Sequence, residues 1–105
     1  MIKLTKDTDL IFCQICEEFL TRRKHGIDKE NAIMFANPAV LQTQFLQGTL
    51  ESDIRSAIKE LRSKKLLKAY IDNSFQLTDD AIIYIENRFK NRLKEVVDII
   101  AKLRP

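Results

Sequence analysis

The chain has 105 residues, of which 45% are hydrophobic and 31% are charged, and its formal net charge is +3. This length supports a single hydrophobic core and excludes a second catalytic domain, while two glycines and two prolines leave little sequence for flexible linkers. The start MIKLTKDTD lacks an apolar signal sequence, and no apolar run reaches the roughly 18 residues needed to span a bilayer. We therefore expect one domain, residues 1–105, that is cytoplasmic and has no membrane partner.

Charge is segregated along the chain. Residues 49–70 contain six basic side chains against three acidic ones, and residues 86–105 contain the same numbers. The segment between them is acidic and carries Asp72, Asp79 and Asp80. A net charge of +3 is too small to argue for nucleic acid by itself. Its uneven distribution, however, is expected when one or two faces of a protein meet phosphate.

The first predicted helix is Asp7–His25, with Thr8 or Asp7 at its start and Gly26 at its end. Its apolar residues recur at helical spacing, at Leu10, Ile11, Phe12, Ile15, Cys16, Phe19 and Leu20. The basic residues of its last turn, Arg22 to Lys24, either contact phosphate or only solvate the helix end. Before this helix, Met1 to Leu4 could form an edge strand beside a later hairpin.

Two short helices are expected next. Asp28–Ala36 has Asp28 as a cap and Ala32, Ile33 and Phe35 on its inner side. Pro38–Gln47 begins at a proline, which suits a first helical turn, and Gly48 ends it. Its candidate core residues are Val40, Leu41, Phe45 and Leu46. The role of the whole segment 28–48 stays open.

The helix Leu50–Lys65, capped by Thr49, is the candidate DNA reader. Its core stripe is Leu50, Ile54, Ile58 and Leu61, with Ala57 beside it, and its opposite face carries Ser52, Arg55, Ser56, Lys59, Arg62 and Ser63. Small hydroxyls between long cations suit a groove, because serine allows a close approach while arginine and lysine reach phosphates or guanine edges. Asp53 and Glu60 weaken this pattern.

A small hairpin follows directly, with strands Leu66–Ile71 and Ser74–Leu77 joined at Asp72-Asn73. An Asp-Asn pair is suited to a tight turn with positive φ. The tip has no cation, and Lys68 is the one basic residue within the hairpin.

The last predicted helix, Asp79–Arg104, is capped by Thr78. Apolar residues at Ile82, Ile85, Phe89, Leu93, Val96, Ile100 and Leu103 average 3.5 residues apart, which is the period of a coiled coil. A helix of this length exceeds what a small domain covers, so we expect dimerisation through Phe89, Leu93, Val96, Ile100 and Leu103. In the alternative, the stripe folds back over its own domain.

Two stretches have a layout that is typical of a known family: AIKELRSKKLLKAY, a helix that runs straight into a strand, and FQLTDDAIIYIE, a strand that ends where a helix begins. Their layout resembles the winged-helix transcription regulators of bacteria, archaea and phages, in particular small single-domain members related to the PadR and MarR groups. The family patterns L-x-x-x-G-L-I and L-T-x-x-G are matched at Leu61, Leu66 and Leu67, and at Leu77 and Thr78. Lys65 and Ala81 stand where those patterns have glycine. The resemblance covers Asp7–Glu86 and implies DNA reading by Leu50–Lys65, dimerisation through the terminal helices, and no enzyme activity.

We therefore expect a mainly α fold with a small β-hairpin (α+β), a winged helix-turn-helix in residues 1–78 and a long dimerisation helix in residues 79–105. The expected function is transcription regulation by a homodimer that binds duplex DNA. DNA would be contacted by Ser52, Arg55, Ser56, Lys59, Arg62, Lys64, Lys65 and Lys68. The alternative is a winged-helix module that binds another protein, through the long helix or through Ala36–Leu46.

Other chemistry has little support in the sequence. Cys13 and Cys16 form one C-x-x-C inside a helix, and His25 cannot complete the four ligands that zinc needs. Two buried thiols are the expected reading, with a redox switch as the alternative. We find no P-loop, dinucleotide fingerprint or catalytic triad spacing, so we expect no enzyme activity, no cofactor and no metal.

Overall fold

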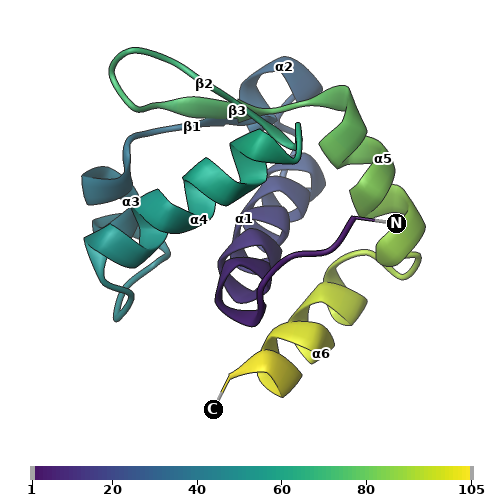
Figure 1. The fold of residues 1–105 in the computed structure, drawn as a ribbon. Helices are drawn as coiled ribbons and strands as arrows, with labels where there is room; N and C mark the ends of the chain where they lie inside the picture. The colour runs from purple at the N-terminus through teal and green to yellow at the C-terminus, as the bar shows by residue number, and fades with distance from the viewer. Residues whose placement is uncertain (1, 105) are drawn as a thin grey trace.

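A computed structural model describes residues 2–104 and shows a mainly helical chain with one small antiparallel sheet (Figure 1). This confirms the α+β class. The elements in chain order are α1 Lys6–Lys24, α2 Lys29–Ala32, β1 Met34–Phe35, α3 Pro38–Gln44, α4 Glu51–Ser63, β2 Leu67–Ala69, β3 Phe75–Leu77, α5 Asp79–Arg88 and α6 Leu93–Leu103. None of the helices within residues 2–104 is long and apolar enough to cross a membrane.

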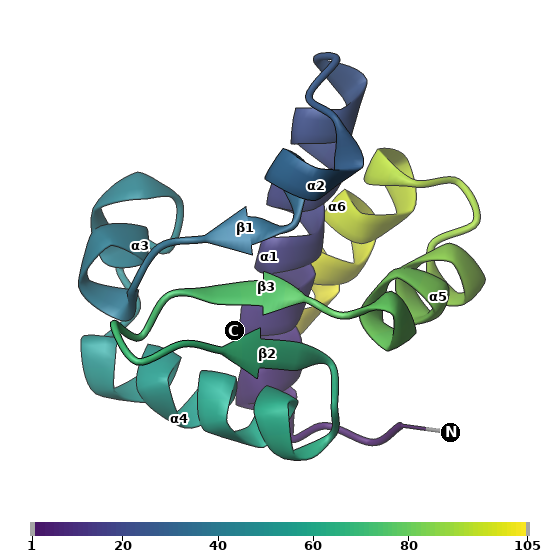
Figure 2. The same ribbon diagram turned by 90° about the horizontal axis from the view of Figure 1, so that it is seen from above.

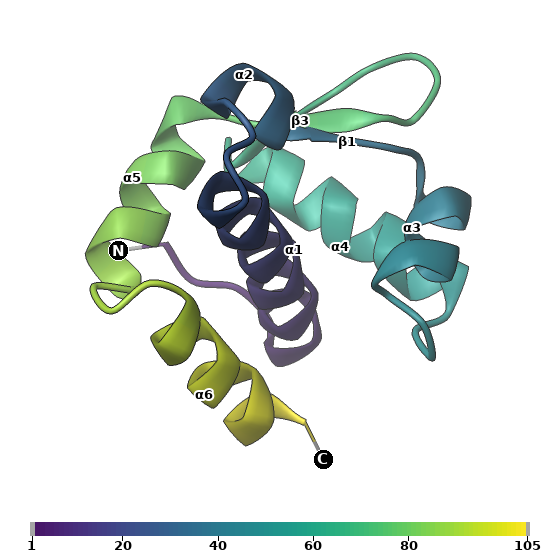
Figure 3. The ribbon, with the colours of Figure 1, turned by 180° about the vertical axis from the view of Figure 1, so that it is seen from behind.

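Helix α1 lies at the centre of the molecule. Helices α3 and α4 lie on one side of it and α5 and α6 on the other, as Figures 1 and 3 show from opposite directions. The sheet lies above the helices in Figure 1, and its strands run across the direction of α1 in Figure 2. This central position explains why α1 buries residues around most of its circumference, including Phe12, Ile15 and Phe19.

The predicted first helix is confirmed, although its start differs. The N-cap residue is Thr5 rather than Asp7 or Thr8, and Thr8 is buried inside the first turn. At the other end, Gly26 has φ +87°. Its backbone N–H donates to Arg23, and this left-handed residue ends the helix as expected.

The predicted helix Asp28–Ala36 is wrong in its second half, because α2 ends at Ala32 and Met34–Phe35 forms β1. The sheet order is β1-β3-β2, and Phe35 lies opposite Phe75 in the register. Their rings stack at 5.2 Å between centroids. Residues 2–4 form no strand, so the edge strand expected in Met1–Leu4 comes from β1 instead; Met1 itself lies outside the described residues.

Helix α3 is shorter than predicted and ends at Gln44. The side chain of Asn37 caps it by accepting from the Val40 N–H at 3.1 Å. Leu41 and Leu46 are buried and Phe45 is half-buried, as expected, whereas Val40 is exposed. The alternative docking segment Ala36–Leu46 therefore turns its two leucines into the core.

Helix α4 begins after Leu50, which is the N-cap residue in place of the predicted Thr49. Leu50 was expected in the core stripe, but 66% of it is exposed, because it lies outside the first helical turn. The remainder of the stripe is confirmed: Ile54, Ala57, Ile58 and Leu61 are buried.

The hairpin strands are also shorter than predicted. The Tyr70 N–H donates to the Ser74 carbonyl at 2.9 Å, and the Asn73 N–H donates to the Tyr70 carbonyl at 2.9 Å. The loop between them is therefore Ile71 to Asn73, and the left-handed residue is Asn73 with φ +68°. A three-residue hairpin loop commonly closes with one such residue.

The predicted continuous helix Asp79–Arg104 is wrong. The chain leaves the helix at Phe89, turns through Arg92 at φ +55°, and α6 packs back against α1. Phe89, Val96 and Ile100 are buried within the single chain, and Leu93 and Leu103 pack half-buried against the same core. These side chains cannot pair with another copy while α6 stays on α1, so the fold-back alternative describes this structure. The homodimer itself stays a prediction.

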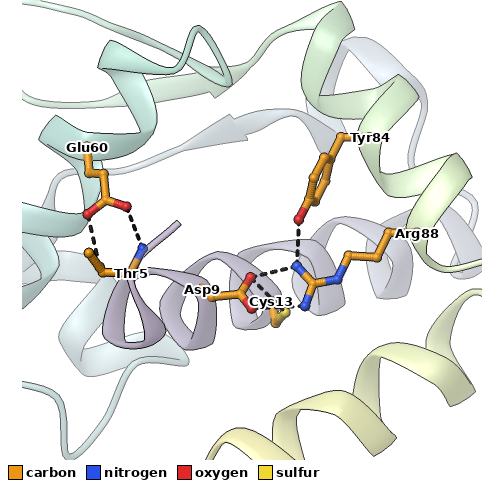
Figure 4. A network of polar contacts seen from close by, with 6 residues as sticks. All are labelled: Thr5, Asp9, Cys13, Glu60, Tyr84 and Arg88. Atoms are coloured by element: carbon orange, nitrogen blue, oxygen red, sulfur yellow. Dashed lines mark hydrogen bonds and ion pairs between the residues drawn. The ribbon is translucent and has the colours of Figure 1, made fainter. Parts of the chain in front are cut away.

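Hydrogen bonds and an ion pair link α5 to α1 (Figure 4). Arg88 binds both carboxylate oxygens of Asp9, through Nη1 at 2.6 Å and Nη2 at 2.9 Å. The same Nη1 lies 2.6 Å from the Tyr84 hydroxyl. A bidentate pair fixes direction as well as distance, so it orients the end of α5 before the chain reverses into α6.

Candidate nucleic-acid interface

The side chains expected to contact DNA are all exposed. Five of them lie on the outer face of α4, namely Ser52, Arg55, Ser56, Lys59 and Arg62. Lys64 and Lys65 follow the helix in the turn before β2, and Lys68 lies on β2. The buried stripe of α4 packs toward α1 and α3, and this packing holds the basic face outward.

The structure brings three of these cations to one hollow. Arg55, Lys59 and Arg62 line a depression of about 160 Å³ between α4 and the hairpin. The hairpin contributes Ala69 and Asn73, while Pro38 and Ile58 complete the lining. Ser52, Ser56, Lys64, Lys65 and Lys68 lie outside it. The hollow joins helix and hairpin into one cationic surface, which is suited to a phosphate oxygen.

Two of the three acidic side chains of α4, Glu51 and Glu60, have partners within the chain. Glu51 pairs with Arg55 at 2.9 Å along the same helix. Glu60 turns toward α1, where its carboxylate accepts from the Thr5 N–H at 2.9 Å and from the hydroxyls of Thr5 and Thr8 at 3.0 Å each (Figure 4). The Thr5 N–H bond, followed by those hydroxyls, lowers the pKa of Glu60. Glu60 therefore weakens the basic face less than the sequence indicated.

The hairpin tip is acidic and apolar. Both the hydroxyl and the N–H of Ser74 donate to Asp72, and these bonds, the hydroxyl first, lower the pKa of that carboxyl. Ile71 is fully exposed beside it. Lys68 holds its ammonium 5.7 Å from the centroid of the Tyr70 ring, whose hydroxyl bonds Gln76. A carboxylate at the tip disfavours close contact of this loop with phosphate.

Lys65, which stands where the pattern L-x-x-x-G-L-I has glycine, adopts φ +64°. Its N–H donates to the Arg62 carbonyl and the next N–H, of Leu66, donates to the Leu61 carbonyl, both at 3.0 Å. This pattern is a Schellman motif, which requires a left-handed residue. Ala81, at the second glycine position, lies in the first turn of α5, where its N–H is capped by Thr78.

Of the basic residues that end α1, Arg22 has a structural role. Its Nη1 donates to the carbonyls of Ala32 at 3.2 Å and Met34 at 2.6 Å. The guanidinium also lies 4.4 Å from the Phe35 ring centroid. These contacts fix the path from α2 into β1. Arg22 is therefore not part of the candidate interface.

Neither cysteine is placed for reactivity. Cys13 and Cys16 are free and buried in α1, as expected for structural thiols. Burial, followed by the nearby Asp9 charge, raises the pKa of Cys13 to about 12, and burial raises the pKa of Cys16 well above its usual range. Both effects disfavour the nucleophilic thiolate. Within residues 2–104, no group of three or more His, Cys, Asp and Glu side chains is arranged to hold a metal ion.

Sequence reasoning missed two features of the interface. One is Asn73, which was recognised as a turn residue but not as a wall of the cationic hollow. The other is the exposed side chain of Ile71, which could have been noticed because a large β-branched residue stands directly beside the turn. Comparisons with protein-family models, curated proteins and solved structures find no match for this chain.

Proposed function

We propose that the protein is a winged-helix DNA-binding regulator that contacts duplex DNA chiefly through α4, with the β2–β3 hairpin beside it in a secondary role. The observation that carries the proposal is the cationic hollow shared by α4 and the hairpin, lined by Arg55, Lys59 and Arg62. A recognition helix enters the major groove while neighbouring elements contact the backbone. In this arrangement the outer face of α4 meets the groove and the hollow receives a flanking phosphate.

The order of elements supports the same proposal. The succession α1-β1-α3-α4-β2-β3 with sheet order β1-β3-β2 is the one expected of a winged helix, and α2 is an insertion before β1. The exposed Ser52 and Ser56 allow close approach to base edges, while Lys64, Lys65 and Lys68 extend the cationic surface along the backbone.

The test is fluorescence anisotropy with a random-sequence duplex at low salt. We expect Lys59→Gln with Arg62→Gln to weaken binding roughly tenfold, because two phosphate contacts are lost. Arg55→Gln has a smaller effect, since its guanidinium is already paired with Glu51. The circular dichroism spectrum and melting curve of each variant should match those of the parent, because exposed side chains contribute little to stability.

The matched control is Arg23→Gln with Lys90→Gln, which removes one arginine and one lysine from exposed positions near α5 and leaves α4 intact. We expect this control to bind duplex DNA as the parent does. If both double variants lost the same amount of DNA affinity, the loss would come from the change in overall charge. This result would contradict the interface proposed on α4.

The second candidate function is that of a winged-helix module that binds another protein. The exposed apolar side chains of Met34 on β1 and of Tyr70 and Ile71 at the hairpin loop line one shallow hollow and favour this function, because exposed apolar patches mark interaction sites. Capture of one stoichiometric protein partner that is lost in Ile71→Ser, without a DNA shift at low salt, would select this function over DNA binding.

A further inference from the structure

A second hollow region lies away from α4. It is a cleft of about 340 Å³ lined by the C-terminal half of α1, by α2, by α5 and by the loop that leads into α6. Because α5 and α6 lie across α1 from α3 and α4 (Figure 3), this cleft and the cationic hollow are on different sides of the molecule. The cleft has no part in the proposed DNA contact.

The floor of the cleft is hydrocarbon. Phe19 and Leu20 come from α1, Ile82 and Ile85 from α5, and Phe89 from the following loop. All but Ile82 are buried, and Ile82 is half-buried. An apolar group that enters here removes mainly its own surface and that of Ile82 from water, because the other four side chains of the floor are already buried, and this removal favours binding.

The mouth of the cleft is cationic. Arg23, Lys29, Lys90 and Arg92 surround it, against a single carboxylate from Glu86. All five are exposed side chains. Lys29 has a partner outside the cleft, Asp79 at 3.5 Å, and Arg23 donates one N–H to the Ile27 carbonyl at 3.2 Å. The remaining positive charge is available to an anion.

The break between α5 and α6 creates this combination. The Arg92 N–H donates to the Phe89 carbonyl at 2.8 Å, which closes a turn that buries Phe89 and leaves Lys90 and Arg92 in solvent. A neighbouring hollow of about 450 Å³ also includes Arg23 and Arg92 and adds Lys24 and Lys94. The two arginines therefore stand where two cationic hollows meet.

We propose that the cleft binds a small organic monocarboxylate, an apolar body with one acid group. The body would lie on the floor of the cleft and the carboxylate would pair with the cations at the mouth. A neutral apolar molecule leaves the cations unused, and an inorganic anion makes no use of the space over the floor and beside Ile82. The volume is at the lower end of the roughly 300–1,000 Å³ typical of small-molecule sites, which suits an aromatic or medium-chain acid.

The test is an NMR titration of the 15N-labelled full chain with octanoate and, separately, with 2-naphthoate. Saturable shifts of the backbone amides of Leu20, Phe89 and Arg92 are expected with at least one acid, and the tighter acid identifies the aliphatic or aromatic source. Octanol and acetate, which each supply one half of the chemistry, are expected to bind at least roughly tenfold more weakly. Absence of saturable shifts, or equal binding of octanol or acetate, overturns the proposal.

Variants locate the binding. Arg23→Gln with Lys90→Gln is expected to raise the dissociation constant roughly fivefold or more, whereas Lys59→Gln with Arg62→Gln on the other side of α1 leaves it unchanged. Ile82→Trp, which fills the floor and keeps every cation, is expected to abolish binding. Unchanged affinity in both cleft variants places the acid elsewhere and contradicts the proposal. The outcome is independent of DNA binding, because the ligand and the readout are different.

Discussion

Glu60 illustrates how a residue that counts against DNA binding in the sequence has a structural use. The carboxylate bonds the backbone N–H of Thr5, the N-cap residue of α1, and the hydroxyl of Thr8 in the first turn. In a capping box the N3 side chain makes the first of these bonds. Here a residue on α4 makes it, so one carboxylate both caps α1 and holds α4 against it.

The Glu60→Gln variant is expected to lose about 1 kcal/mol of the free energy of unfolding at neutral pH. Because the pKa of Glu60 is lowered from its ordinary 4.5 in the folded protein, its charge stabilises the fold above that value. This contribution disappears as the pH falls through the lowered pKa. Urea titrations should therefore show the difference between parent and variant shrinking in acid. A constant difference across the acid range, or the same pattern in the exposed control Glu30→Gln, would contradict this role.

Lys65 and Gly26 occupy equivalent positions after two helices, with φ +64° and +87°. A residue with a Cβ in the left-handed conformation destabilises the fold by roughly 1–2 kcal/mol. Glycine avoids this strain, but part of the gain is offset because glycine makes the unfolded chain more flexible. We expect Lys65→Gly to raise the free energy of unfolding by about 0.5 kcal/mol. The matched change Lys64→Gly, at φ −89°, should lower it by a similar amount. Thermal denaturation measures both, and destabilisation by Lys65→Gly would show that its side chain matters more than its backbone.

Helix α6 is stabilised by its own domain, and two adjacent valines test this. Val96 is fully buried and Val97 is 48% exposed. Val96→Ala should lower the free energy of unfolding by about 1.5–2 kcal/mol, from lost burial and an unfilled cavity. Val97→Ala should change it by less than about 0.5 kcal/mol. We expect the difference between the urea midpoints of the parent and Val96→Ala to be the same at every protein concentration, because a seam between subunits at α6 would make the cost of this change depend on concentration.

The sequence predicted those elements whose signals are local. The amphipathic stripe of α4, the hairpin and the Thr78 cap of α5 all follow from spacing or from one capping residue. Strand β1 could not be predicted, because two residues gain strand geometry only by pairing with β3, about forty positions later. The same is true of Glu60, whose partner Thr5 is 55 positions away.

The break between α5 and α6 was hidden for a different physical reason. No glycine or proline marks residues 89–92, and Arg92 takes a positive φ that arginine rarely adopts. Apolar spacing also continues across the break, because Phe89 and Val96 are buried on either side of it. A stripe of period 3.5 therefore fits a helix that folds back on its own core as well as a helix that meets a partner.

At the scale of the whole molecule, positive charge is divided between two sides of α1. One side presents the outer face of α4 and the turn after it, and the other presents the mouth of the cleft beside α5. The net charge of +3 is too small to favour DNA binding by itself, so the local concentration of charge on each side matters more. If only the first side meets DNA, the cations of the second side should contribute little to the dependence of affinity on salt.

We predict that the logarithm of the DNA association constant falls with the logarithm of salt concentration at a slope between about −3 and −5, since each neutralised phosphate adds roughly −0.9. Lys59→Gln and Arg62→Gln should each make the slope shallower by about 1, because both side chains line the hollow beside the hairpin. Arg23→Gln and Lys90→Gln, across α1, should leave it unchanged. Anisotropy titrations at several salt concentrations give the slopes of the parent and of the four variants. If the variants on the two sides of α1 changed the slope equally, DNA would make diffuse contact with the entire protein. A defined interface predicts instead that only its own residues change the number of counterions released.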